Sequence, residues 1–303
     1  MSRNVKVMLK SWISAMRLRT LPLALASIGM GSFLAASKGG FSLSVFVMAL
    51  LTTLCLQILS NLANDYGDSI HGADHSNRQG PSREVQSGKI SRSQMKGAIV
   101  LCAVITLIVG ICLLWIAGVP KEVFLAFAGL GCLAMLAAVL YTNGARPYGY
   151  IGLGDISVFL FFGWLGVLGV YYLMTKRVDL DLLLPGSACG LFTVAVLNVN
   201  NIRDIDSDLE AGKYSIPVRL GRHRATWYHI ALLIVGLLLA ITYTVLHYNK
   251  PIQLLYLIII PLLFINGKAI VTKTNAQDLD PYLKQMALTT LAFVLFFGVG
   301  ILL

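Results

Sequence analysis

Apolar residues run through this sequence in long stretches of about 20 residues, separated by short polar segments. That is the length an α-helix needs to cross the hydrocarbon core of a bilayer. The pattern therefore predicts an all-α polytopic membrane protein and argues against a soluble fold. The expected transmembrane helices, nine in all, lie at residues 20–37, 43–62, 97–117, 122–142, 152–174, 182–201, 225–247, 252–272 and 284–303.

Composition supports the same fold class. The chain has 303 residues, of which 57% are hydrophobic and 13% charged, and its mean hydropathy is +0.76. Residues 1–19 differ from the rest, because basic residues alternate there with Trp12 and Met16. This segment is typical of an amphipathic helix lying on the membrane surface. It has no short apolar core followed by a cleavage site, so we do not interpret it as a signal peptide.

Lysine and arginine predict the orientation. With the N-terminus in the cytoplasm, 19 of the 24 basic residues face the cytoplasm and five face outside. The positive-inside rule then places the N-terminus inside and the C-terminus outside. The net charge of +10 is explained by this topology. No basic and aromatic groove pattern indicates nucleic-acid binding.

Two clusters of aspartate and asparagine stand at the ends of apolar stretches predicted to face the cytoplasm. A carboxylate at the edge of a membrane helix is costly and requires a partner. Residues three or four apart share a helix face, so each cluster can point in one direction. The first cluster contains Asn61, Asn64, Asp65 and Asp68, and the second contains Asn200, Asp204 and Asp208.

Carboxylate oxygens in pairs, without cysteine, suit Mg²⁺, which completes its coordination with water and substrate phosphates. The alternative is that these aspartates cap helices or neutralise nearby cations. Their recurrence in the second half of the chain favours a single shared site. It also indicates one domain, residues 1–303, built from two possible half-bundles, 20–142 and 143–303, that face each other across a cavity.

Cationic and aromatic residues follow the clusters. Arg83 and Lys213 lie in polar loops that could close over an anion, although the positive-inside bias alone also places cations there. The loop between the fourth and fifth spans carries Tyr141, Arg146 and Tyr148. It could hold a planar aromatic substrate, or it could be an interfacial aromatic belt.

Two weaker patterns concern packing. Gly163, Gly166 and Gly169 recur within one span, which is typical of close helix contact. The five cysteines all fall inside spans without a CxxC pair, and we interpret them as buried apolar thiols. They are Cys55, Cys102, Cys112, Cys132 and Cys189.

The motifs resemble a known family. Asn64-Asp65-x-x-Asp68 and Asp204-x-x-x-Asp208, the latter followed by Gly212-Lys213, are similar to the two aspartate-rich motifs of the UbiA superfamily of intramembrane aromatic prenyltransferases. The resemblance covers nearly the whole chain. Among its subfamilies, the pattern looks most like the 1,4-dihydroxy-2-naphthoate polyprenyltransferases. Asp74 follows Asp68 by six residues instead of the superfamily's four, so its role is open.

The resemblance implies nine transmembrane helices around a central cavity, with the active site at the cytoplasmic side of a bacterial inner membrane. It implies Mg²⁺-dependent transfer of a polyprenyl group from polyprenyl diphosphate to 1,4-dihydroxy-2-naphthoate, with loss of CO₂ and diphosphate, giving demethylmenaquinone. It indicates no obligate protein partner. The implied site residues are Asp65 and Asp68 for one Mg²⁺, Asp204 and Asp208 for a second, Asn61 or Asn64 as assisting ligands, Arg83, Arg146 and Lys213 for the diphosphate, and Tyr141 and Tyr148 beside the acceptor.

Two alternatives stay open. Another acceptor, such as 4-hydroxybenzoate or homogentisate, would suit the same motifs. A transporter also combines repeats with intramembrane carboxylates, but its site usually lies near the bilayer midplane, whereas these clusters lie at helix ends.

Overall fold

The computed structural model describes residues 3–71 and 83–303, and every regular element within these ranges is helical. The predicted all-α class is confirmed. In chain order the elements are α1 (Arg3–Ala15), η1 (Leu18–Thr20), α2 (Leu21–Ser37), α3 (Leu43–His71), α4 (Arg92–Ala117), α5 (Lys121–Leu140), η2 (Tyr148–Ile151), α6 (Gly154–Val158), η3 (Phe159–Leu165), α7 (Gly166–Thr175), η4 (Leu180–Leu182), α8 (Leu183–Arg203), α9 (Ile205–Glu210), α10 (Ile216–Leu246), η5 (Pro251–Ile259), α11 (Ile260–Thr272), η6 (Ala276–Leu279) and α12 (Asp280–Leu302).

Eight helical stretches in the described ranges are long and apolar enough to cross a membrane. The remaining apolar helix, α2, is shorter, with 17 residues. The chain is therefore a multi-pass membrane protein, as predicted, while the count of nine spans stays a prediction. The eight stretches are Leu43–His71, Arg92–Ala117, Lys121–Leu140, Gly154–Thr175, Leu180–Arg203, Ile216–Leu246, Pro251–Thr272 and Ala276–Leu302.

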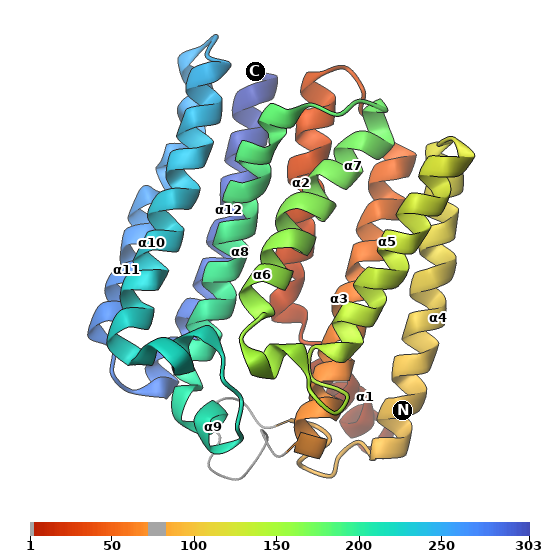
Figure 1. Cartoon of the computed structure of the whole chain (residues 1–303), viewed down its shortest axis with the longest axis vertical. Helices are drawn as coiled ribbons and strands as arrows, with labels where there is room; N and C mark the ends of the chain where they lie inside the picture. The colour runs from red at the N-terminus through yellow and green to blue at the C-terminus, as the bar shows by residue number, and fades with distance from the viewer. Residues whose placement is uncertain (1–2, 72–82) are drawn as a thin grey trace.

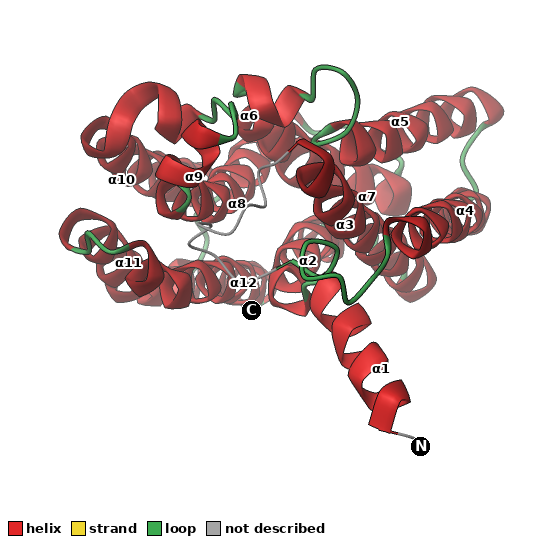
Figure 2. Cartoon of the chain, turned by 90° about the horizontal axis from the view of Figure 1, so that it is seen from below, coloured by secondary structure: helices red, strands yellow, loops and turns green. Residues whose placement is uncertain are grey.

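The helices differ in how deeply they are buried. Helix α8 lies inside the bundle, with α10, α12 and α2 packed around it. Helix α5 has a single buried residue, Ala134, and lies with α4 at one side of the molecule (Figures 1 and 2). An apolar helix with an exposed surface of this kind is suited to lipid contact. Of the five cysteines, only Cys189 is fully buried and Cys132 is exposed, so the expectation of buried thiols is wrong for Cys132.

The span Gly154–Thr175 is irregular in its middle. Residues Phe159–Leu165 form a π-helix, η3, a conformation that is rare and frequently found at functional sites. The predicted close contact of the glycines is confirmed at two positions. A Cβ at Gly163 would lie 2.9 Å from the carbonyl oxygen of Gly186, and one at Gly166 would overlap the hydroxyl of Ser27.

The two aspartate clusters lie at the same end of the bundle, which also carries α1 and α9, while the C-terminus lies at the opposite end (Figure 1). Helix α3 continues nine residues past its predicted end at residue 62, so Asp65 and Asp68 lie in its last two turns. Helix α8, which carries the start of the second cluster, ends at Arg203, two residues past its predicted end at residue 201.

The expectation that Asn200, Asp204 and Asp208 share one helix face is wrong. Helix α8 ends at Arg203, Asp204 has a non-helical backbone (φ −98°, ψ 12°), and α9 begins at Ile205. Asp208 then lies in the first turn of α9, where the partial positive charge of the helix N-terminus favours a carboxylate. The division into half-bundles stays a prediction.

Candidate active site

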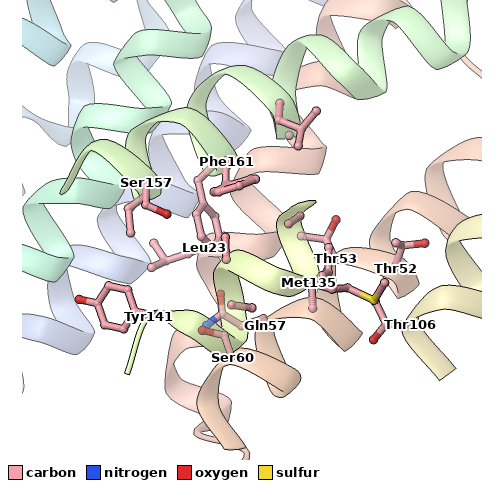
Figure 3. A pocket seen from close by; sticks show the side chains of 18 of the residues that line it. Leu23, Thr52, Thr53, Gln57, Ser60, Thr106, Met135, Tyr141, Ser157 and Phe161 are labelled. Atoms are coloured by element: carbon pink, nitrogen blue, oxygen red, sulfur yellow. The ribbon is translucent and has the colours of Figure 1, made fainter. Parts of the chain in front are cut away.

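A cavity of about 370 Å³ opens among α3, α4, α5, the irregular span and α8. In Figure 3, Tyr141 and Ser157 lie on one side of it, and Thr52 and Thr106 lie on the other. Most of its wall is apolar, and its polar residues include eight that the sequence predicted. These are Asn61, Asn64, Asp68, Arg83, Tyr141, Tyr148, Asn200 and Lys213.

Asp68 is the aspartate of the first cluster that lines the cavity. Its Oδ1 accepts a hydrogen bond from the Tyr150 hydroxyl (3.0 Å), and its Oδ2 lies 3.8 Å from a guanidinium nitrogen of Arg83. Asp65 is buried behind it and accepts long backbone hydrogen bonds from Glu84 (3.3 Å) and Val85 (3.5 Å). The first cluster therefore also contacts the segment that begins at Arg83 and holds its backbone in place. Asp74 lies outside the described residues.

The second cluster is organised by Arg203. Its guanidinium makes a bidentate contact to Asp204, with both distances 2.8 Å, and donates to Asn200 Oδ1 at 2.9 Å. A third contact, 2.6 Å long, reaches Asp280 at the start of α12. A buried carboxylate held by a fork of this kind is both neutralised and fixed in orientation. Asp204 does not line the cavity.

Asp208 and Lys213 form a buried ion pair, with Lys213 Nζ 3.1 Å from Asp208 Oδ1. The other carboxylate oxygen, Asp208 Oδ2, is buried and has no hydrogen-bond partner within residues 3–71 and 83–303. Burial raises the pKa of Asp208 to about 6, although the charge of Lys213 opposes the shift. A carboxylate with an unpaired oxygen in a buried setting is suited to binding a cation.

Lys213 connects the two clusters. Burial lowers the pKa of its ammonium, but the carboxylates of Asp208 and Asp68 outweigh that effect and hold the pKa above its usual value. The ammonium therefore stays charged and lies within the electrostatic reach of both clusters. It also lies 6.0 Å from the centre of the Tyr150 ring. The structure thus brings together the clusters that the sequence predicted to share a site.

The residues fit a divalent metal in one particular way. Within residues 3–71 and 83–303, no group of three His, Cys, Asp or Glu side chains could hold an ion by itself. Asp68 and Asp208 nevertheless present oxygens near a common lysine, and Asp208 Oδ2 is unpaired. This arrangement suits Mg²⁺ ions that take few ligands from protein and the remainder from water and a bound phosphate.

The tyrosine wall is built by close backbone contact. The rings of Tyr141 and Tyr148 meet edge to face with centroids 5.3 Å apart, and a Cβ at Gly154 would lie 2.8 Å from the Tyr141 hydroxyl. The Tyr148 hydroxyl donates to the carbonyl of Ala137 (2.9 Å) and lies 3.0 Å from Ser157 Oγ. Arg146 of the same loop is exposed and does not line the cavity, so the structure does not bring this predicted residue to the site.

Arg17 lines the cavity and was missed from the sequence. Its backbone is left-handed (φ 48°, ψ 59°), which is uncommon for a residue other than glycine. The Asn61 amide holds this turn by donating to Met16 O (2.9 Å) and Thr20 Oγ1 (3.2 Å). Asn61 therefore positions Arg17. Charge alone did not distinguish Arg17 from the other basic residues of the N-terminal segment.

A second, apolar space of about 610 Å³ adjoins the cavity between α5 and the irregular span. The residues that line both spaces come from α5, η3 and α7; they are Phe127, Leu130, Phe161, Leu165 and Gly169. The π-helix thus forms part of the boundary. One of its carbonyls, that of Phe162, accepts a hydrogen bond from Ser27 Oγ at 2.6 Å.

The chain is similar to known proteins over nearly its full length. The model of the UbiA prenyltransferase family matches residues 24–291. A Haemophilus influenzae protein named 1,4-dihydroxy-2-naphthoate octaprenyltransferase is 43% identical, with 97% of this chain and 96% of that protein covered. The Escherichia coli protein of the same name is 42% identical, with 97% and 96% covered.

The fold also matches solved structures. The structure of a UbiA homolog from Archaeoglobus fulgidus bound to DMAPP and Mg²⁺ superposes with a TM-score of 0.64 at 18% identity. The match covers 94% of this chain and 98% of that one. At this identity the similarity shows a shared fold.

Proposed function

Because the chain belongs to the UbiA prenyltransferase family, we propose that it transfers a polyprenyl group from polyprenyl diphosphate to 1,4-dihydroxy-2-naphthoate, a step of menaquinone biosynthesis. The observation that carries this proposal is the 43% identity, over nearly the full length of both chains, to a relative named for that acceptor. The cavity supports it, because cations and carboxylates at its polar end adjoin a long apolar wall.

We assign the diphosphate to the polar end of the cavity. Lys213 and Arg83 supply positive charge there, and Arg17 faces the same space. These cations would contact the diphosphate oxygens and stabilise the charge that develops as the leaving group departs. Arg146, which the sequence also predicted to contact the diphosphate, is exposed and does not line the cavity, so we leave it out of this assignment.

Asp65 with Asp68, and Asp204 with Asp208, would hold two Mg²⁺ ions; of these four aspartates Asp68 lines the cavity, as does Asn64. When bound, Mg²⁺ neutralises the diphosphate and favours its departure. The bidentate contact of Arg203 orients Asp204, and the charge of Lys213 opposes the rise that burial causes in the pKa of Asp208. Asp65 additionally holds the backbone at Glu84 and Val85, so its replacement would disturb both metal and loop.

The chemistry requires exclusion of water. The bond between the prenyl carbon and the diphosphate oxygen breaks, the acceptor ring forms a carbon–carbon bond to that prenyl carbon, and the ring carboxylate leaves as CO₂. Water reaching the allylic carbon would give an alcohol instead. The apolar cavity wall would keep water away from the allylic carbon, and Tyr141 and Tyr148, whose rings meet edge to face, would offer the acceptor ring one aromatic face.

The polyprenyl chain requires more room than the inner cavity provides. About 370 Å³ is near the lower end of the range for small-ligand pockets, about 300–1,000 Å³. We therefore assign the distal part of the chain to the adjoining apolar space of about 610 Å³. The relatives are named octaprenyltransferases, and the two adjoining spaces together suit a chain of several isoprene units.

We further propose that the protein lies in the bacterial inner membrane with its N-terminus in the cytoplasm. Basic residues are concentrated at the end of the bundle that carries the aspartate clusters. This orientation presents the site to a water-soluble aromatic acid made in the cytoplasm. A cysteine introduced at exposed Gln86 should then react with membrane-impermeant reagents only after the cytoplasmic side is opened.

The function is tested by supplying the purified protein with Mg²⁺, octaprenyl diphosphate and one acceptor at a time. The acceptors are 1,4-dihydroxy-2-naphthoate, 4-hydroxybenzoate and homogentisate, and the lipid product is identified by mass. We expect product only, or at least about tenfold faster, with the naphthoate. Preference for another acceptor would contradict the assignment within the family, and absence of product with all three would contradict the function.

A further inference from the structure

Asn201 presents a buried amide to the cavity from the last turn of α8. Its side chain is 2% exposed and lines the cavity. Its Oδ1 has no hydrogen-bond partner among the described residues. Buried acceptors in proteins are nearly always paired, with protein, water or ligand. The unpaired oxygen therefore indicates a donor that is supplied by whatever fills the cavity.

The chemistry of the substrates identifies this donor, provided that the proposed function holds. A polyprenyl chain has no hydrogen-bond donor, and an ionised diphosphate presents only acceptors. The ring hydroxyls of the aromatic acceptor are donors. We propose that Asn201 accepts a hydrogen bond from a ring hydroxyl of the acceptor, and thereby orients the ring and selects for a hydroxylated one.

Position favours Asn201 over another amide in the same cavity. Gln57 also lines the cavity, and its Oε1 has no partner in the part of the chain that the structure describes. Gln57, however, lies about three helical turns from Asp68, whereas Asn201 lies within one turn of Asp204. The ring must meet the carbon that carries the diphosphate, so it must lie at the polar end. The neighbouring Asn200 is already bonded to Arg203.

Asn198 provides a matched control. It lies on the same helix and is fully buried, and its Nδ2 lies 3.4 Å from Ala225 O. Its Oδ1, like that of Asn201, has no partner among the residues described. It does not line the cavity. A general effect of placing an apolar side chain in α8 should therefore appear at both positions, whereas loss of a contact to the acceptor should appear only at Asn201.

The experiment measures equilibrium binding of three compounds to the full-length protein in detergent, without prenyl diphosphate. They are 1,4-dihydroxy-2-naphthoate, 1-hydroxy-2-naphthoate and 4-hydroxy-2-naphthoate. We expect the wild-type protein to lose about tenfold or more in affinity for at least one monohydroxy compound, because a buried acceptor then stays unpaired. In Asn201→Leu this preference should fall below about threefold, and Asn198→Leu should keep it.

Asn201→Ala, compared with Asn198→Ala, gives the same test if the leucine variant does not fold. An undiminished hydroxyl preference in folded Asn201 variants would overturn the inference and indicate that Asn201 Oδ1 is hydrogen-bonded to water instead. It would equally be overturned if the variants changed only the Mg²⁺ requirement, since Asn201 would then serve a metal. Failure of the wild type to bind any of the three compounds or to form product from the dihydroxy compound would contradict the proposed function itself.

Discussion

Replacing Lys213 by methionine removes a buried positive charge while keeping a side chain of similar length. Lys213 is 8% exposed and lies 3.1 Å from Asp208. A hydrogen bond to a charged group contributes about 1.5–3 kcal/mol. If Lys213 makes one such contact to the departing diphosphate, Lys213→Met should lower kcat/KM by about 10- to 150-fold. The substitution should also raise the pKa of Asp208 further and so weaken metal binding.

The assay is release of diphosphate with the prenyl diphosphate concentration varied and both Mg²⁺ and the acceptor saturating. Lys38→Met is a suitable control, because Lys38 is exposed and does not line the cavity. We expect its kcat/KM to stay within about twofold of wild type, since an exposed charge contributes little. Wild-type kcat/KM in folded Lys213→Met would refute the role of Lys213 in binding the diphosphate.

Three further predictions follow from particular positions. Burial raises the pKa of Asp208 to about 6, and Mg²⁺ must displace the proton that Asp208 binds below this pH. The Mg²⁺ concentration for half-maximal activity should therefore rise as pH falls through about 6. A Mg²⁺ requirement that does not change with pH would contradict this prediction. Gly169→Leu should fill the boundary between the two spaces and lower activity with octaprenyl diphosphate at least about fivefold more than activity with geranyl diphosphate. Gly129 lies outside both spaces, so Gly129→Leu should leave activity with both substrates unchanged. Equal losses with both substrates in Gly169→Leu would argue against a path for the polyprenyl chain at this boundary. Arg146→Lys should change turnover less than about twofold because Arg146 is exposed. A tenfold loss of turnover would instead indicate that Arg146 contacts the diphosphate.

The sequence was most informative where the chemistry is costly in a membrane. Carboxylates at the ends of apolar stretches are uncommon, so Asp68 and Asp208 could be predicted as candidate site residues from their position and residue type alone. Their spacing then indicated a shared site, and the structure brings them together through Lys213. The all-helical class followed from the length of the apolar stretches, because a helix satisfies its own backbone in lipid.

Other features depend on contacts that no local pattern encodes. Arg17 reaches the cavity because Asn61 holds a left-handed turn from the neighbouring helix α3. The break at Asp204 coincides with the bidentate contact of Arg203 and with a new helix whose first turn favours Asp208. The π-helix Phe159–Leu165 has an ordinary apolar sequence, and its irregular hydrogen bonding accompanies contacts with Ser27 and Gly186. These are tertiary effects, and sequence periodicity does not report them.

The proposed reaction is a Mg²⁺-dependent prenyl transfer in which the acceptor loses its carboxylate. The most direct measurement supplies 1,4-dihydroxy-2-naphthoate with an isotopic label in the carboxyl group, together with octaprenyl diphosphate, and follows labelled CO₂ and diphosphate in the same reaction. We predict equal amounts of both, with neither released when Mg²⁺ is chelated. Release of diphosphate without labelled CO₂ would contradict the proposed loss of the carboxylate. Transfer that persists in excess chelator would contradict the proposed dependence on Mg²⁺.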